Sequence, residues 1–151
     1  MEFLIKTEEE LAGVAEEVIE ALLNQPLRSQ ATVLALIGEL GAGKTAFTKY
    51  LLKALGVTDL VSSPTFILMR PYPLVHENFS VAYHIDVYRL EEPVQELEKL
   101  GIEEILKDPK HLVIIEWADM VEGLLPRDAV KMRMGHEGET SRLIQLEGLE
   151  L

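Results

Sequence analysis

The sequence predicts an α/β fold whose mixed β-sheet is mainly parallel at its centre and extended by antiparallel strands. The apolar run Val33–Ile37 leads into a helical pattern over residues 46–55 that stops at a glycine. A second continuous apolar run, within residues 111–117, is typical of a central strand covered on both faces. Near the end, the runs 129–134 and 141–146 flank turn glycines, which predicts a β-hairpin.

Between the first strand and its helix lies the segment Gly38-Glu-Leu-Gly-Ala-Gly-Lys44-Thr45. Glycines followed by Lys and Thr at this spacing are typical of a phosphate-binding loop, and a strand before and a helix after it form the required context. In such a loop, backbone N–H groups and the helix dipole converge on phosphate oxygens. Lys44 would reach the β- and γ-phosphates, and the Thr45 hydroxyl would ligate Mg²⁺.

The alternative, a glycine-rich turn that binds nothing, does not require the Lys-Thr pair or both flanking elements. We therefore predict a P-loop NTPase-like three-layer sandwich that binds ATP or ADP. The predicted nucleotide-binding residues are Glu39, Leu40, Gly41, Ala42, Gly43, Lys44, Thr45 and Ala46.

Length, charge and cysteine content limit the classes of protein to which the chain can belong. A chain of 151 residues predicts a single domain, residues 1–151, and the absence of cysteine excludes disulfides and thiolate metal sites. The formal charge of −12 should repel a phosphate backbone, so either a partner holds any nucleic acid or the charge simply favours solubility. No apolar run has the length of a membrane span, and the start Met1-Glu2 is unlike a signal peptide, which favours the cytoplasm.

The N-terminal segment predicts an edge strand at Phe3–Ile5 and then an amphipathic helix. Thr7 and Glu10 have the spacing of a capping box, in which Thr7 caps the helix and Glu10 reaches back to the Thr7 N–H. Apolar residues recur at intervals of three and four and predict one buried helical face: Leu11, Val14, Val18 and Leu22. Thr7 has a second interpretation, a position near the nucleotide base.

The segment from Val61 to Leu68 follows the first loop-flanking helix and is rich in hydroxyl groups. Pro64 blocks regular pairing, so we expect a loop that becomes a strand at Phe66–Leu68. Nucleotide-sensing switch loops occupy this place in related folds, which makes Thr65 a candidate sensor of the γ-phosphate or Mg²⁺, although a simple Ser/Thr turn fits equally. Residues 70–78, which contain two prolines, are predicted to form a loop.

Residues 80–90 alternate as a strand does. His84, Asp86 and Tyr88 share one face, which is either solvated or part of a site. Asp86 is a candidate magnesium ligand or water-positioning base, with His84 and Tyr88 as its support.

Two further elements follow. The apolar spacing from Glu92 to Leu106 predicts two short helices hinged at Gly101. Glu116 ends the second apolar strand, where strand ends open into a ligand crevice, and is therefore a candidate to order Mg²⁺ or the attacking water. Trp117 either packs in the fold, the commoner case, or stacks near the nucleotide or a partner.

Several segments together resemble the TsaE family (formerly YjeE), the small bacterial ATPases required for making threonylcarbamoyladenosine in tRNA. The phosphate loop alone is shared by many families, whereas two other segments are more specific. These are Ser-Pro-Thr-Phe at 63–66 and His-Ile-Asp-Val-Tyr-Arg at 84–89. Three shorter segments are also similar: Ile-Glu-Trp at 115–117, Leu-Gly-Ile at 100–102 and Leu-Leu-Pro at 124–126. Length and motif order agree, so the resemblance covers essentially the whole domain.

The resemblance implies an ATPase of weak activity alone, whose turnover supports repeated cycles of a two-protein transferase, TsaD with TsaB. That transferase modifies adenosine 37 of tRNA, so this chain would meet tRNA only through the complex. By position, Lys44 and Thr45 bind phosphate and Mg²⁺, and Thr65 is the switch residue. The resemblance also implies that Asp86 and Glu116 are the acids essential for hydrolysis, with Trp117 beside them.

Two other functions stay open. A small-molecule kinase would share the phosphate loop but needs an acceptor pocket and usually a basic lid, which residues 71–80 do not offer. A nucleotide-dependent scaffold would use binding rather than turnover. The sequence shows no arginine in a recognisable finger position, so we expect full activity to require a group or an ordering event from a partner.

Overall fold

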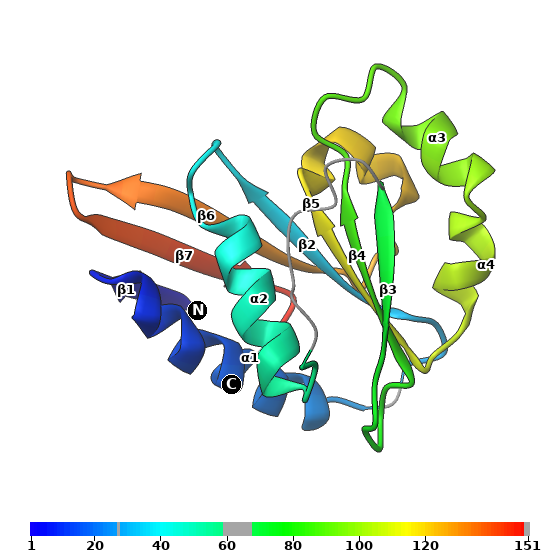
Figure 1. Ribbon diagram of the computed structural model, residues 1–151, viewed down its shortest axis with the longest axis horizontal. Coiled ribbons are helices and arrows are strands. Elements are labelled where there is room, and N and C mark those ends of the chain that lie inside the picture. The colour runs from blue at the N-terminus through cyan, green and yellow to red at the C-terminus, as the bar shows by residue number, and fades with distance from the viewer. Residues whose placement is uncertain (27, 59–67, 150–151) are drawn as a thin grey trace.

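The computed structural model describes residues 1–26, 28–58 and 68–149. Their strands form one mixed sheet in the order β1-β7-β6-β2-β5-β4-β3 (Figure 1). The strands are β1 (Glu2–Ile5), β2 (Thr32–Gly38), β3 (Met69–Pro73), β4 (Val81–Asp86), β5 (His111–Glu116), β6 (Val130–Glu137) and β7 (Ser141–Glu147). Strand β2 runs parallel to β5 and β6, and β4 runs parallel to β5, whereas the outer pairs are antiparallel. This arrangement confirms the predicted mixed sheet with a parallel centre.

Helices cover both faces of the sheet. On one face lie α1 (Leu11–Leu23), which begins after the 3₁₀ turn η1 (Glu8–Glu10), and α2 (Lys44–Ala54). The other face is covered by α3 (Pro93–Lys99), α4 (Ile102–Lys107) and the 3₁₀ segment η2 (Ala118–Leu124). The three layers agree with the prediction, and no helix in the described ranges has the length and apolarity needed to span a bilayer.

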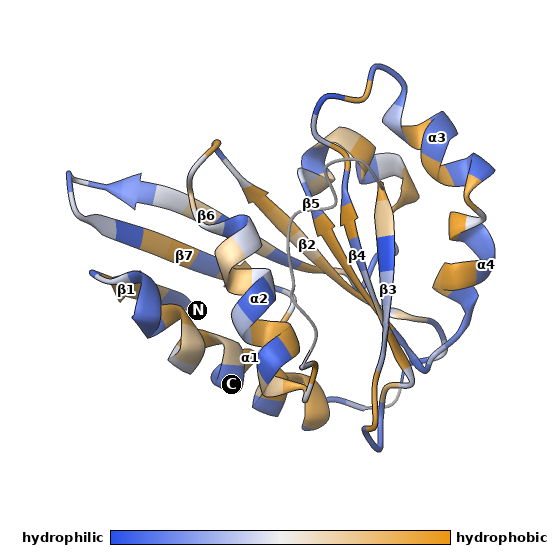
Figure 2. Ribbon diagram, viewed as in Figure 1, coloured by the Kyte–Doolittle hydropathy of each residue, from blue (hydrophilic) through white to orange (hydrophobic). Residues whose placement is uncertain are grey.

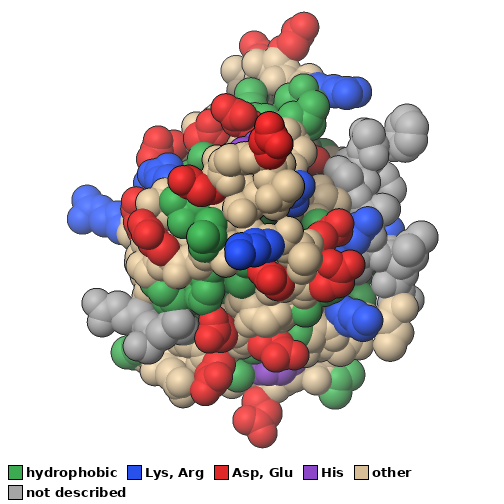
Figure 3. All heavy atoms as spheres, turned by 90° about the vertical axis from the view of Figure 1, so that its left-hand side faces the viewer, with side chains coloured by type: hydrophobic (Ala, Val, Ile, Leu, Met, Phe, Trp, Pro, Cys, Tyr) green, Lys and Arg blue, Asp and Glu red, His purple; other side chains and the backbone are tan. Residues whose placement is uncertain are grey.

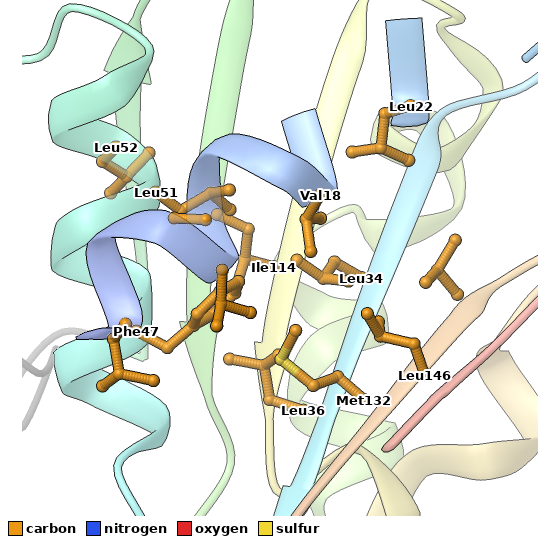
Figure 4. Close-up of a cluster of buried hydrophobic side chains, with 14 of the residues drawn as sticks. Val18, Leu22, Leu34, Leu36, Phe47, Leu51, Leu52, Ile114, Met132 and Leu146 are labelled. Atoms are coloured by element: carbon orange, nitrogen blue, oxygen red, sulfur yellow. The ribbon is translucent and has the colours of Figure 1, made fainter. Parts of the chain in front are cut away.

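The central strands are largely apolar (Figure 2), and their side chains alternate between two separate hydrophobic cores, one on each face of the sheet. Toward α1 and α2, Leu34, Leu36 and Ile114 pack with helical residues such as Val18 and Phe47 (Figure 4). Toward α3, α4 and η2, the intervening strand residues pack instead; these include Val33, Ala35, Val113 and Ile115. The sheet therefore has two buried faces, as the apolar runs predict.

The N-terminal elements are largely as predicted, but the capping box is not formed. Strand β1 lies at the edge of the sheet, and the four apolar positions predicted in α1 are buried. Thr7, however, makes no side-chain capping hydrogen bond, and the Glu10 carboxylate accepts from the backbone N–H of Lys6 at 2.8 Å. The prediction was wrong because the chain enters α1 through a 3₁₀ turn, whose tighter winding does not reproduce the geometry of an α-helical N-cap.

The predicted loop over residues 70–78 is also corrected, because residues Met69–Pro73 form strand β3 at the sheet edge. Its register pairs Pro71 with Tyr83 and Pro73 with Val81 of β4. An edge strand tolerates proline because every second N–H faces away from its only neighbour. Of the predicted strand Phe66–Leu68, only Leu68 is described, and it precedes β3. Thr65 lies outside the described residues.

The remaining elements confirm the predicted pattern with one shift. Helices α3 and α4 meet at Gly101, whose φ of 82° allows the sharp turn between them. The C-terminal hairpin forms, but its strands extend to the pair Glu137 and Ser141, so Gly135 lies inside β6 rather than in the turn. The backbone pairing continues past Gly135 because its φ is not positive, and Gly138 (φ 72°) provides the reversal.

Candidate functional site

The phosphate loop connects the end of β2 to the start of α2, and its glycines are required by geometry. A Cβ on Gly38 would lie 2.4 Å from the carbonyl oxygen of Met134 in the neighbouring strand β6. Gly41 and Gly43 adopt φ angles of 80° and 108°, which other residues rarely adopt. Gly43 directly precedes α2, so the loop presents its N–H groups at the positive end of that helix. This backbone geometry suits the binding of an anion.

Lys44 is the first residue of α2 and is almost fully buried. Its Nζ donates to the carbonyl oxygens of Gly38 at 2.6 Å and Glu39 at 2.9 Å, and it lies 4.0 Å from the centre of the Trp117 ring. Burial lowers the pKa of Lys44, and the nearby charges of Glu116, Asp86 and Asp119 oppose that shift. The lysine is therefore held at the loop by carbonyls and an aromatic face.

Glu116, at the carboxyl end of β5, is buried and bound through both carboxylate oxygens. The Thr45 hydroxyl donates to Oε1 at 2.7 Å, and Nε2 of His84 lies 2.5 Å from Oε2. Since an ionised carboxylate only accepts, Nε2 of His84 is the donor. His84 is fully buried, and its Nδ1 has no hydrogen-bond partner within the described residues. His84 was predicted to support Asp86, but it contacts Glu116 instead.

Asp86 ends strand β4 beside Glu116. The two residues are register partners on adjacent parallel strands, so their carboxylates meet at one edge of the sheet. Asp86 is half-buried, and its Oδ1 accepts the backbone N–H of Tyr88 at 3.0 Å. Alternation along β4 places His84 and Asp86 on the α2 side of the sheet, which confirms the predicted shared face for these two residues, whereas Tyr88 lies in a turn beyond the end of β4.

Thr45, Glu116 and Asp86 bring one hydroxyl and two carboxylates together at the start of α2. Hard oxygen donors are the ligands that Mg²⁺ prefers, so these residues fit that ion. Within the described ranges, no three His, Cys, Asp or Glu side chains form a cluster that would hold a metal without other ligands. Mg²⁺ differs from most metals in this respect, because it usually takes one or two protein ligands and completes its shell with phosphate and water.

These residues line a cleft of about 760 Å³. Its aromatic wall is formed by Trp117 and Tyr88, whose rings stack with centroids 4.8 Å apart. Trp117 directly follows β5, Arg89 lies three residues after the end of β4, and the two adopt positive φ angles of 61° and 73°. Trp117 therefore belongs to the cleft wall as well as to the packing. The lining consists of Glu8, Leu40, Gly41, Gly43, Lys44, Thr45, Ala46, Leu68, Asp86, Tyr88, Arg89, Leu90, Glu116, Trp117 and Arg142.

Three predicted nucleotide-binding residues do not line the cleft. Ala42 is fully buried behind the loop, and its N–H donates to the Glu39 carbonyl, which also accepts from Lys44. Thr7 instead lines a separate cavity of about 140 Å³, beside the hairpin residues His136 and Ser141. Glu39 and Ala42 thus shape the loop through their backbone, whereas Thr7 lies outside the main cleft.

Sequence reasoning missed two arginines, Arg89 and Arg142, which both line the cleft. Arg89 lies in the 84–89 segment, three residues after Asp86, and this short spacing could have predicted that it lies near the site. Arg142 comes from β7, far along the chain, and no motif surrounds it. Only the hairpin's docking beside β2 brings it to the loop.

Comparison with known proteins gives a consistent result. The family model described as "Threonylcarbamoyl adenosine biosynthesis protein TsaE" matches residues 5–144. The chain is 36% identical to the tRNA threonylcarbamoyladenosine biosynthesis protein TsaE of Bacillus subtilis, covering 82% of this chain and 74% of that protein. It is 35% identical to the protein of the same name from Rickettsia felis, covering 95% and 77%. The crystal structure of Bacillus subtilis YdiB superimposes with a TM-score of 0.73 at 27% identity, covering 97% of this chain and 83% of YdiB.

Proposed function

Because the chain belongs to the TsaE family of threonylcarbamoyl adenosine biosynthesis proteins, we propose that it is a Mg²⁺-dependent ATP hydrolase serving this tRNA modification. The observation that carries the proposal is the hydrogen-bonded series Thr45–Glu116–His84 beside Asp86, directly in front of the phosphate loop. A turn that merely connected β2 to α2 would not require a buried carboxylate at that place, since burying a charge is costly without a role.

Each residue has a distinct part in the proposed reaction. The loop N–H groups and Lys44 bind the polyphosphate and stabilise the charge that develops on the transferred phosphoryl group. Both oxygens of Glu116 are fixed by His84 and Thr45, so Glu116 orders the Thr45 hydroxyl rather than moving during the reaction. When bound beside Thr45 and Glu116, Mg²⁺ would neutralise phosphate charge.

The reacting water is assigned to Asp86, which lines the cleft and is less buried than Glu116. The water oxygen forms a bond to the γ-phosphorus as the bond from that phosphorus to the β–γ bridging oxygen breaks. Asp86 orients the water and accepts its proton, and ADP and phosphate leave. Tyr88 holds one Asp86 oxygen through its backbone N–H, which fixes the direction of the carboxylate.

A partner is part of the proposal. Acidic side chains are scattered across the face seen in Figure 3 and outnumber the basic ones there, in keeping with a formal charge of −12. Such a surface repels a polynucleotide, so we assign tRNA binding to a transferase of TsaD–TsaB type, with this chain acting on the complex in the cytoplasm. Two exposed apolar side chains of the cleft lining, Leu40 and Tyr88, are our candidates for the contact with that partner.

The test is hydrolysis by the purified chain with Mg²⁺, alone and with the transferase complex. We expect phosphate release from ATP that increases when the complex is added and disappears in the Lys44→Ala variant. Phosphate found on a small nucleoside or acid instead of in solution would support a kinase. A Glu116→Ala variant that binds ATP and supports full tRNA modification in cells would support a scaffold and contradict the proposal.

The partner is tested separately by pull-down with ADP and with a non-hydrolysable ATP analogue. We expect the tRNA-modifying transferase in the eluate, with a yield that depends on the nucleotide. Its absence with both nucleotides would contradict the assigned partner and leave hydrolysis to be decided by the first experiment.

A further inference from the structure

We propose that Arg142, on the C-terminal hairpin, is a phosphate-binding residue of the cleft and contacts the α- and β-phosphates beside Gly43. This inference rests on the proposed function in one respect, because it assumes that the cleft takes a nucleoside polyphosphate. It adds a cation from a part of the chain that carries no nucleotide-binding motif.

The hairpin directs Arg142 toward the phosphate loop. Along β7, Ile144 and Leu146 are buried in the core between the sheet and α1 and α2, and Arg142 has the same parity. Arg142 is the register partner of Ile5 in β1 and of His136 in β6, so neighbouring strands hold its backbone on both sides. Its position is therefore set by the sheet rather than by a free loop.

The guanidinium lies against the loop itself. A Cβ placed on Gly43 would be 3.0 Å from Nη1 of Arg142 and 3.3 Å from Cε of Met134. Arg142 also lines the cleft together with Lys44, Thr45 and Glu116. The φ of 108° requires glycine at position 43, and the guanidinium occupies the space beside it.

Arg142 has no carboxylate within ion-pair distance among the described residues, although Glu8 also lines the cleft. Within the described ranges, Arg142 makes neither a hydrogen bond nor an ion pair, although its side chain is half-buried. Arg28 and Arg133, by contrast, are paired with Asp128 and Glu147. In a chain with 26 acidic residues, a half-buried arginine without a carboxylate partner points to an anion from outside the chain.

Its place along the loop predicts which phosphates it contacts. In a phosphate loop, the backbone N–H groups cradle the α- and β-phosphates, whereas the lysine reaches the β- and γ-phosphates. Gly43 belongs to the first set and Asp86 lies at the γ end. Arg142 should therefore contribute to binding of ADP and ATP alike, and little to the hydrolytic step.

The experiment measures the affinity for ADP, for ATP without hydrolysis and for inorganic tripolyphosphate in the full chain. The variants are Arg142→Ala, Arg142→Lys and, as matched control, Arg133→Ala. The control removes the same charge from the same hairpin, but Arg133 alternates with the buried Met132 and Met134 and so points away from the α1 and α2 layer.

We expect Arg142→Ala to weaken ADP and ATP binding by a similar factor, about tenfold to a hundredfold, as for the loss of a charge-assisted hydrogen bond. Tripolyphosphate binding should weaken in parallel, and turnover at saturating ATP should stay within about threefold of wild type. Arg142→Lys should recover part of the affinity, because lysine keeps the charge but not the planar fork. Arg133→Ala should match wild type.

Two results would overturn the inference. One is an Arg142→Ala affinity equal to that of Arg133→Ala, and the other is a loss confined to turnover, which would place Arg142 at the γ-phosphate. Failure of the proposed function gives a different result, since the wild-type chain would then bind neither ADP nor tripolyphosphate. Melting curves without ligand show whether Arg142→Ala is folded, and Arg142→Lys supplies the test if it is not.

Discussion

Side chains of the central strands alternate between two layers whose chemistry differs. Toward α1 and α2 lie the buried polar side chains that the described residues contain: Thr32, Lys44, Thr48, His84 and Glu116. Toward α3, α4 and η2, the buried side chains are apolar. Ile115 and Glu116 are neighbours in β5, yet Ile115 packs in the layer of α3, α4 and η2, whereas Glu116 accepts two hydrogen bonds on the α1 and α2 side.

The difference shows that both faces of the sheet bury apolar side chains, whereas the buried polar groups are confined to one face. An apolar layer contributes free energy simply by removing surface from water. A buried carboxylate with two donors is at best neutral for stability, because desolvation offsets the attraction. The α1 and α2 layer keeps such a group where the strand ends open into the cleft. Substitutions in the two layers should therefore affect different measurements.

The largest effect is expected for Glu116→Gln, which keeps the side chain's shape and removes its charge. We expect the rate of ATP turnover to fall about 10²- to 10³-fold, a loss of roughly 3–4 kcal/mol of transition-state stabilisation. ADP affinity and the unfolding midpoint should change far less. Steady-state hydrolysis measures the turnover, and ADP titration of the same preparation measures the affinity. Turnover within fivefold of wild type would contradict the assigned role.

Ile115→Ala tests the other layer at the adjacent position. Ile115 is 1% exposed, so the truncation leaves a cavity and should lower the free energy of unfolding by about 2–5 kcal/mol. Well below the unfolding midpoint, turnover and ADP affinity should stay within about twofold of wild type. Urea unfolding measures the free energy of unfolding, and Ile115→Val is a milder control that should lower it by about 0.5–1.5 kcal/mol. A large loss of turnover in folded Ile115→Ala would break the separation between layers.

A smaller effect concerns the pH dependence of Lys44, whose pKa is lowered from 10.5 by burial. As pH rises through the lowered pKa, Lys44 loses its charge, so ADP affinity should fall before an ordinary lysine would titrate. The free energy of unfolding should rise over the same pH range, because there the unfolded chain binds more protons than the folded one.

This prediction is checked by ADP titrations and urea unfolding from neutral pH to about pH 10, the region below the ordinary lysine pKa. Lys44→Met serves as the reference, and the difference between the two proteins isolates the lysine from other titrating groups. Parallel curves for both proteins would show that Lys44 does not titrate in this range.

The smallest effects come from backbone conformation alone. Gly101→Ala should lower the free energy of unfolding by about 1 kcal/mol, because its φ of 82° is strained for alanine. Gly13→Ala should raise it by about 0.5–1 kcal/mol, since Gly13 is inside α1 and nothing lies within 4 Å of its added Cβ. Neither change should alter ADP affinity. Effects of the same sign would mean that layer position, not backbone conformation, governs these two sites.

Much of the candidate site could be predicted because its residues have local signals. Lys44 and Thr45 belong to a motif whose spacing requires them, and Glu116 ends an apolar run that reads as a central strand. His84 was predicted on the correct face of its strand, but its partner was not, because register between β4 and β5 depends on pairing across some 30 residues. The prolines of β3 gave a wrong prediction, since only the sheet order shows that this strand lies at the edge.

The sequence by itself determined the phosphate loop, the elements around it and the two acids at strand ends, since each depends on the spacing of neighbouring residues. Tertiary structure alone decided three other features. It paired His84 with Glu116, stacked Trp117 on Tyr88 beneath Lys44, and placed Arg142 against Gly43. The physical reason is that these contacts join segments far apart in the chain, and their geometry follows from how the sheet order and register bring those segments together rather than from any local pattern.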